Sequence, residues 1–225
     1  MSKLKKNVLR DLVYTQLKTM LLDKALVPGQ KINKKEIADL LGVSQTPVQE
    51  SIIKLIQEGL FEEKPGQGIV VKVFTDQDMR DYFAVRAGIE GIALRLCISQ
   101  KGPSCLEDVL SLFDDFTLPI DDPKVIERYQ QTDRHFHEEI LRRSGNKIII
   151  HFVEDFNFIL HCYHKGLLRE PNETLHEHLE IIQAARDGDA EKAQNLLMKH
   201  HLTSYDRISE DHLLYVSRDV EELHA

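Results

Sequence analysis

The segment that decides the fold is Glu36-Ile37-Ala38-Asp39-Leu40-Leu41-Gly42-Val43-Ser44-Gln45-Thr46-Pro47-Val48-Gln49-Glu50, which continues to Gly59-Leu60. Its apolar spacing predicts two short amphipathic helices. Ile37, Leu40 and Leu41 fall on one face of the first helix, and Gly42 supplies the positive φ that ends it. Two helices joined by so tight a turn are typical of a DNA-binding helix-turn-helix.

The second helix of the pair has its own start signal. Thr46-Pro47-Val48-Gln49 fits a capping box with proline at the first helical position. Gly59 ends the helix, and its apolar stripe is Val48, Ile52, Leu55 and Ile56.

The flanking residues complete a small winged domain. An amphipathic helix over about 7–24 precedes the pair. After Gly59, two β-rich segments surround the turn Pro65-Gly66-Gln67-Gly68, which predicts a hairpin, or wing. We place the domain boundary near 74–75, which gives a winged helix-turn-helix domain over 1–74 and a second domain over 75–225.

The second domain shows only helical periodicity. Helices are expected at roughly 76–100, 104–115, 123–144, 147–167, 172–187 and 189–210. The predicted fold class is therefore mainly α, with an N-terminal winged helix-turn-helix and a C-terminal all-α antiparallel helical bundle.

Charge divides the chain in the same way. Residues 1–74 carry 12 Lys+Arg and 8 Asp+Glu, a net charge of +4, whereas residues 75–225 carry 17 and 29, a net charge of −12. A basic front and an acidic rear suit a DNA-reading module attached to a domain with another task. All 11 histidines lie between His135 and His224.

The composition is that of an ordinary soluble protein, with 42% hydrophobic and 29% charged residues. No apolar run is long enough to span a bilayer, and no signal peptide is recognised, so we expect no membrane partner. Three cysteines without C-x-x-C spacing favour a reducing, cytoplasmic location.

A recognition helix presents polar side chains to base edges and cations to phosphates. The candidates for base contact are Ser44, Gln45, Thr46 and Gln49. Lys34, Lys35 and the wing tip Gln67-Gly68 are candidate phosphate contacts. The alternative is that this winged module is a protein–protein contact.

Four side chains in the bundle are predicted to face one another. Asp133 and His137 are spaced i, i+4 on the apolar face of their helix, close enough to chelate one ion. His178 lies on the core face defined by its neighbours, and His200 shares the apolar stripe of the last helix. His176 and Glu177 are expected to face outward, with His201 at the edge of the stripe.

The alternative for each histidine is a singly hydrogen-bonded core residue. Burying three imidazoles and a carboxylate without a shared partner is costly, so the set favours a metal. Mixed nitrogen and oxygen ligation suits a divalent ion, Zn²⁺, Ni²⁺, Mn²⁺ or Fe²⁺, with zinc the first choice.

The N-terminal residues resemble the GntR family of bacterial transcription regulators. The resemblance rests on Pro28-Gly29, Ile37-Ala38, Leu41 through Glu50, and Glu58-Gly59-Leu60. The family's two recognition-helix arginines are Gln45 and Gln49 here, and a third is Lys35. Because glutamine pairs with adenine whereas arginine favours guanine, we expect a more A·T-tolerant operator and weaker phosphate attraction.

The second domain resembles the all-helical ligand-binding domain of the fatty-acid-responsive subgroup. Asp133, His137, His178 and His200 match the ligands of its metal-binding members. The resemblance implies a metal with open positions that a small organic acid fills through its carboxylate. Arg86 resembles an arginine that faces this pocket, although an i, i+4 salt bridge to Glu90 is an equal alternative. Asn146 is a second candidate effector contact, or the end of a helix.

The sequence therefore predicts a homodimeric regulator that binds a double-stranded DNA operator and is not an enzyme. Its rivals are a metalloenzyme in which the site activates water, a pure metal sensor, and a purely structural metal. The sequence shows no additional inward acid placed as a general base, which weighs against the enzyme.

Overall fold

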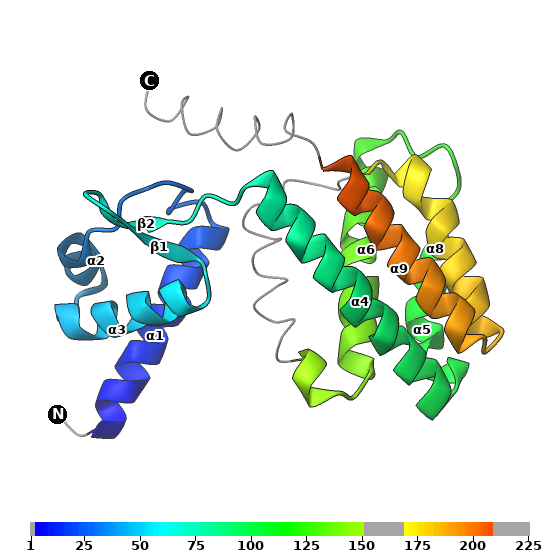
Figure 1. Cartoon of the computed structure of the whole chain (residues 1–225), viewed down its shortest axis with the longest axis horizontal. Coiled ribbons are helices and arrows are strands. Elements are labelled where there is room, and N and C mark those ends of the chain that lie inside the picture. The colour runs from blue at the N-terminus through cyan, green and yellow to red at the C-terminus, as the bar shows by residue number, and fades with distance from the viewer. Residues whose placement is uncertain (1–2, 151–168, 209–225) are drawn as a thin grey trace. The chain divides into compact units, whose positions relative to one another are not determined.

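The structure, a computed structural model, describes residues 3–150 and 169–208 (Figure 1). These residues form two compact units, and the first boundary between them falls between Thr75 and Asp76. Helices dominate both ranges, and one two-stranded sheet accompanies them, which confirms the predicted fold class. No helix within these ranges is long and apolar enough to cross a bilayer.

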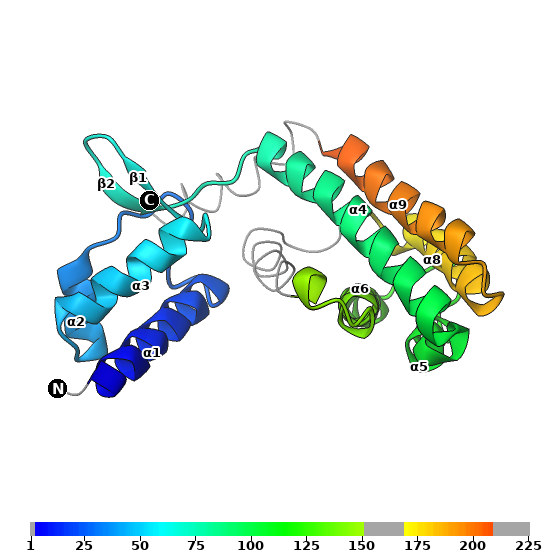
Figure 2. The same ribbon diagram turned by 60° about the horizontal axis from the view of Figure 1, so that its bottom comes forward.

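The N-terminal unit is a winged helix-turn-helix (Figure 2). Its elements in chain order are α1 (Lys3–Leu22), α2 (Lys34–Leu41), α3 (Gln45–Gln57), β1 (Phe61–Lys64) and β2 (Gly68–Val71). The strands pair antiparallel from Phe61↔Val71 to Lys64↔Gly68 and form the wing. The apolar stripe of α3 packs against α1, and Leu17, Val48 and Ile52 are fully buried.

Two details of the helix pair differ from the sequence prediction. The helix α3 begins at Gln45 with Ser44 as its N-cap, so the predicted capping box and first-position proline are wrong. Pro47 is the third helical residue, where a missing N–H leaves no intrahelical bond unmade. Leu40 is 68% exposed, because Ala38 takes the buried position beside Ile37.

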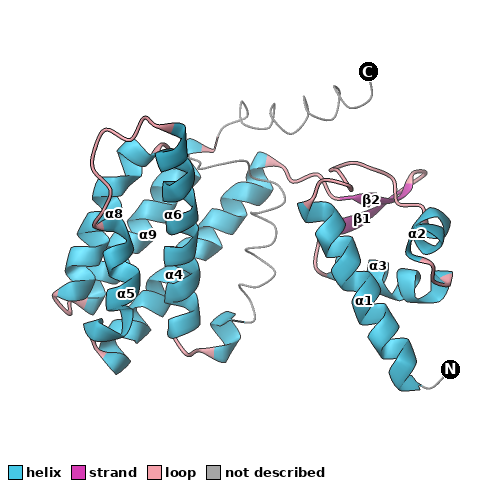
Figure 3. Ribbon diagram, turned by 180° about the vertical axis from the view of Figure 1, so that it is seen from behind, coloured by secondary structure: helices cyan, strands magenta, loops and turns pink. Residues whose placement is uncertain are grey.

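The C-terminal unit is all-helical in its described residues (Figure 3). Its long helices are α4 (Asp76–Lys101), α6 (Pro123–Arg143), α8 (Pro171–Arg186) and α9 (Ala190–Arg207). In place of one helix over 104–115 there are three short turns, η1 (Pro103–Leu106), α5 (Glu107–Leu110) and η2 (Ser111–Phe113). Residues 147–150 are helical, and the rest of the predicted 147–167 helix lies outside the described residues.

The helices α4 and α9 lie side by side over most of their length (Figures 1 and 2). Gly91 permits this approach, because a Cβ there would lie 2.6 Å from the Cγ of Met198. The core around this contact is mainly aliphatic and aromatic, with Tyr129, Phe136 and Ile140 fully buried. On α8, apolar periodicity predicts Leu175, Leu179 and Ile182 on the core face. Leu175 and Ile182 are buried, whereas Leu179 is 41% exposed.

Candidate metal centre and DNA face

The bundle brings four of the predicted side chains together. Asp133 and His137 come from α6, His178 from α8 and His200 from α9. One ligand atom from each lies within 4.8 Å of those of the other three. The three imidazoles are buried, whereas the Asp133 side chain is 16% exposed. This arrangement supplies one carboxylate oxygen and three ring nitrogens to a common point.

The separations within this group suit a first-row metal. Four ligands at about 2.1 Å from one zinc ion lie roughly 3.4 Å from one another. Asp133 Oδ1 lies 3.3 Å from His178 Nε2 and 3.7 Å from His137 Nε2. His178 Nε2 is buried and has no hydrogen-bond partner among the described residues. A cation bound between this ring nitrogen and the Asp133 carboxylate would give the nitrogen a partner.

Each imidazole is held from behind through its Nδ1 atom. His137 Nδ1 lies 2.6 Å from a Glu90 oxygen, and His178 Nδ1 lies 2.8 Å from the Tyr129 hydroxyl. His200 Nδ1 lies 2.7 Å from a Glu177 oxygen. Because Nδ1 is engaged in all three, Nε2 is the atom free to bind a metal.

The two carboxylates behind the histidines are themselves paired with arginines. Arg86 Nε donates to Glu90 at 2.5 Å, and Arg169 Nη1 donates to Glu177 at 2.8 Å. Arg169 is 6% exposed, so its guanidinium depends on this partner. An arginine–glutamate pair therefore holds His137, and a second such pair holds His200.

Burial disfavours the charged form of each titratable side chain in this cluster. Neighbouring groups decide which of these side chains stay charged. Burial raises the pKa of Glu90, but Arg86 and the nearby imidazoles outweigh it and hold that pKa well below its ordinary value. Burial lowers the pKa of His178 well below its ordinary value, and it also lowers the pKa of His200. Both imidazoles are therefore neutral at pH 7, which is the form that binds metals.

Glu90 also accepts a hydrogen bond from His201 Nε2 at 2.7 Å. Glu90, His137 and His201 form a second group of possible metal ligands. Arg86 lies against the same carboxylate, so hydrogen bonds and a guanidinium already satisfy it, and the group fits a support for His137 better than a second cation.

Several of these supporting residues were missed or misplaced by sequence reasoning. Glu177 was expected to face outward and instead holds His200, while His201 is 1% exposed rather than at an edge. Glu90 is the inward acid that the sequence prediction did not find. Its signal was present, because Glu90 shares the period of the buried residues Ala87 and Leu94 on α4.

The two candidate effector contacts have local partners. Arg86 forms the i, i+4 ion pair with Glu90 that was the alternative to a pocket role. Asn146 Oδ1 accepts hydrogen bonds from the backbone N–H groups of Ile148 and Ile149, so it caps the helical residues that follow. His151, His161 and His164 flank an apolar stripe in the sequence, so one of them is a further candidate for the pocket, but all three lie outside the described residues.

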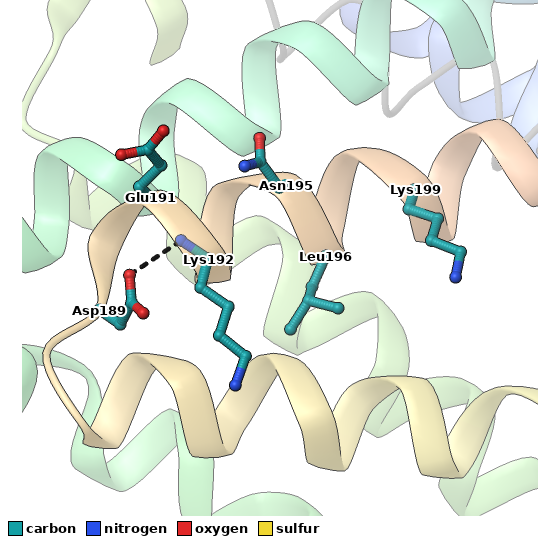
Figure 4. A pocket seen from close by; sticks show the side chains of 6 residues that line it. All are labelled: Asp189, Glu191, Lys192, Asn195, Leu196 and Lys199. Atoms are coloured by element: carbon teal, nitrogen blue, oxygen red, sulfur yellow. Dashed lines mark hydrogen bonds between the residues drawn. The ribbon is translucent and has the colours of Figure 1, made fainter.

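A surface pocket of about 460 Å³ lies elsewhere, at the first half of α9 (Figure 4). Asp189, which caps this helix by accepting from the Lys192 backbone N–H, forms part of its wall. The four candidate ligands do not line it, and its two lysines, Lys192 and Lys199, are exposed. The lining residues are Asp189, Glu191, Lys192, Asn195, Leu196 and Lys199.

The candidate DNA contacts gather on α2, α3 and the wing. Ser44, Gln45 and Thr46 are exposed at the start of α3, and Gln49 is half-buried one turn further on. Lys35 is exposed on the first turn of α2, whereas the Lys34 ammonium donates a 2.6 Å hydrogen bond to Gln49. The wing turn Gln67-Gly68 is also exposed.

The folds of the two units define a winged helix-turn-helix protein with an all-helical second domain. Residues 9–71 match the model of the bacterial regulatory proteins of the gntR family, and residues 81–204 match that of the FCD domain. The chain belongs to the GntR family of DNA-binding transcription regulators, in the group that carries an FCD domain.

Individual relatives agree with this assignment. The chain is 24% identical over 191 residues to an uncharacterized HTH-type transcriptional regulator, YdhC of Bacillus subtilis, with 83% of this chain and 85% of that protein covered. It is 28% identical over 199 residues to an HTH-type regulator of Streptomyces ambofaciens, covering 87% and 83%. The structure of Escherichia coli McbR/YncC has the same fold, with a TM-score of 0.65, 21% identity, and 91% and 98% coverage.

Proposed function

We propose that this regulator holds a divalent metal through Asp133, His137, His178 and His200, and that a small carboxylate bound there modulates operator binding. Zinc is the first choice of metal. The observation that carries the proposal is the common direction of the three imidazoles. Each is fixed through Nδ1, which leaves three Nε2 atoms and one carboxylate for a single ion.

A metal-free core explains the same residues less well. The buried His178 Nε2 has no hydrogen-bond partner in the described chain, and an unsatisfied buried polar atom costs about 1–3 kcal/mol. A cation between His178 and Asp133 removes that penalty and neutralises the carboxylate. Because four protein ligands already complete a tetrahedral site, an exogenous oxygen ligand requires the ion to expand to five or six ligands.

The charge of the site supports an anionic effector that binds after the metal. Asp133, Glu90 and Glu177 are acidic and Arg86 and Arg169 are basic, so the metal-free site has a net charge of −1 when every imidazole is neutral. Burial lowers the pKa of His137 but Glu90 raises it further, and a proton on His137 makes the net charge 0. A divalent ion bound to neutral imidazoles changes the net charge to +1. Because only the metal-loaded site has a positive net charge, binding of a carboxylate depends on the metal.

In the N-terminal domain, the exposed front of α3 reads the operator and the lysines and wing contact the backbone. The residues assigned to this face are Lys34, Lys35, Ser44, Gln45, Thr46, Gln49, Gln67 and Gly68. A homodimer would present two such faces to two half-sites. Exposed apolar side chains on α4 supply a surface for dimer contact, since Val85 and Ile92, seven residues apart, are each 43% exposed.

Elemental analysis and native mass spectrometry of the full chain test the metal and the dimer together. We expect about one divalent ion per chain and a mass of two chains. His178→Ala and His200→Ala should remove most of the metal, whereas His176→Ala, on the exposed side of α8, should retain it. Full occupancy in both ligand variants would refute the assigned set.

Operator affinity then tests the effector. DNA binding is measured for the metal-loaded and the chelator-stripped protein, each with a panel of mono-, di- and tricarboxylates. We expect one class of acid to change affinity by roughly 5- to 150-fold in the metal-loaded protein alone. A response to metal that ignores every acid would identify a pure metal sensor instead.

A further inference from the structure

A half-buried polar contact joins the start of α2 to α3 in the proposed DNA-reading motif. Lys34 is the first residue of α2, and its ammonium lies 2.6 Å from Oε1 of Gln49 on α3. The start of α2 is rigid, because Asn33 Oδ1 accepts from the backbone N–H groups of Lys35 and Glu36. The side chain of Asn33 also donates to Glu36 at 2.6 Å. Lys34 therefore reaches Gln49 from a fixed base.

This contact sets which way the amide of Gln49 faces. An ammonium can only donate hydrogen bonds, so its partner must be the amide oxygen and not the amide nitrogen. The NH₂ group of Gln49 is then left as the free part of the amide. Together the pair offers N–H donors and one positive charge.

Bases differ in what they present to such a pair. Adenine shows an N7 acceptor and an N6 donor in the major groove, whereas guanine shows two acceptors, N7 and O6. A glutamine that reads adenine uses both its oxygen and its nitrogen. At Gln49 the oxygen is engaged, and the ammonium beside it repels an incoming N6–H group.

We propose that Lys34 makes Gln49 a donor-only reading group, so that the pair selects guanine over adenine at one position of the operator. This inference rests on the proposed DNA face of α3 and is independent of the metal site. It reverses, at this position, the adenine preference that glutamine alone predicts. Gln45, exposed one turn earlier, keeps both halves of its amide for adenine.

The test is selection from random double-stranded DNA with the full chain and three variants. Gln49→Ala identifies the base pair that this residue reads, because preference is lost there. At that base pair we expect the natural protein to favour guanine over adenine by about tenfold. Lys34→Met keeps the aliphatic stem, frees the amide oxygen and should shift the preference to adenine.

Lys35→Met is the matched control, since it removes one charge from the neighbouring position without touching Gln49. We expect it to weaken binding to all sequences alike and to leave the base preferences unchanged. Circular dichroism melting of each variant checks that the fold is retained.

The results that would overturn the inference also show whether the proposed DNA face or the role of Lys34 is wrong. If Gln49→Ala leaves every base preference intact, the proposed DNA face is wrong. If Gln49→Ala alters one position but the natural protein selects adenine there, or Lys34→Met still selects guanine, the face stands and the role of Lys34 fails. A uniform loss of affinity in Lys34→Met would make Lys34 a phosphate contact only.

Discussion

Replacing Tyr129 by phenylalanine tests whether the hydroxyl behind His178 orients a metal ligand. That hydroxyl lies 2.8 Å from His178 Nδ1 and 2.8 Å from Thr174 Oγ1. The ring itself is fully buried and packs edge-on against Phe113 and Phe116, so Tyr129→Phe removes hydrogen bonds without opening a cavity. The change therefore acts on the orientation of the imidazole and little else.

The expected loss follows from the chemistry of the contact. Removing the partner of a metal-bound imidazole lowers metal affinity by about 10- to 100-fold, or roughly 1.4–2.7 kcal/mol. Because the Tyr129 hydroxyl is neutral, whereas the partners of His137 and His200 are carboxylates, the lower limit applies. We expect about a tenfold weaker zinc affinity, measured by competition against a chelator of known affinity.

The matched control is Thr174→Val, which removes the other partner of the Tyr129 hydroxyl and leaves its contact with His178. Each variant should lose about 1 kcal/mol of stability in the metal-free form, since each breaks a buried hydrogen bond. Zinc affinity should fall in Tyr129→Phe and stay close to natural in Thr174→Val. Equal affinities in all three proteins, or equal losses in both variants, would refute the orienting role.

Three further outcomes follow from other contacts. Glu177→Gln should weaken zinc binding by about 10- to 100-fold in the same competition, whereas Glu180→Gln, exposed on the same helix, should not. Gly91→Ala should lower the free energy of unfolding by about 1–3 kcal/mol in urea titrations, because its Cβ would lie 2.6 Å from a side-chain carbon of α9. Hydrogen bonding to Arg142 lowers the pKa of Glu139 to about 2, so its stabilisation is present above about pH 4.5 and lost as pH falls toward 2. Glu139→Gln should flatten that acid limb of the unfolding profile, and an unchanged limb would contradict the assignment.

Helical periodicity was enough to locate the elements and most of their buried faces. On α6 the apolar face consists of Ile126, which is partly buried, and Tyr129, Phe136 and Ile140, which are fully buried. The same rule places Asp133 and His137 one turn apart on that face. Periodicity was wrong about Leu40 of α2, which is exposed because Ala38 takes the buried position beside Ile37.

Periodicity within one helix could not predict the contacts between helices, because each contact depends on the angle at which two helices cross. Glu177 lies at the margin of the buried face of α8, and only the approach of α9 makes it the partner of His200. The Lys34–Gln49 contact likewise needs the angle between α2 and α3. Sequence alone predicted that Asp133, His137, His178 and His200 lie together, and the structure confirms this grouping. The sequence supplied none of the hydrogen bonds that orient the three imidazoles.

Glu90 shows how such contacts could link the metal site to the DNA-binding domain. It belongs to α4, which begins at Asp76, five residues after the wing strand β2 ends at Val71. Its carboxylate holds His137 of α6 and His201 of α9 at once. A ligand that moves either imidazole must therefore break these hydrogen bonds or move α4 with them. Arg86, on the same helix, stays paired with Glu90, but each lost hydrogen bond to this buried carboxylate costs about 1.5–3 kcal/mol. We therefore expect α4 to follow, and a coupling of about 1–3 kcal/mol is within reach of this single side chain.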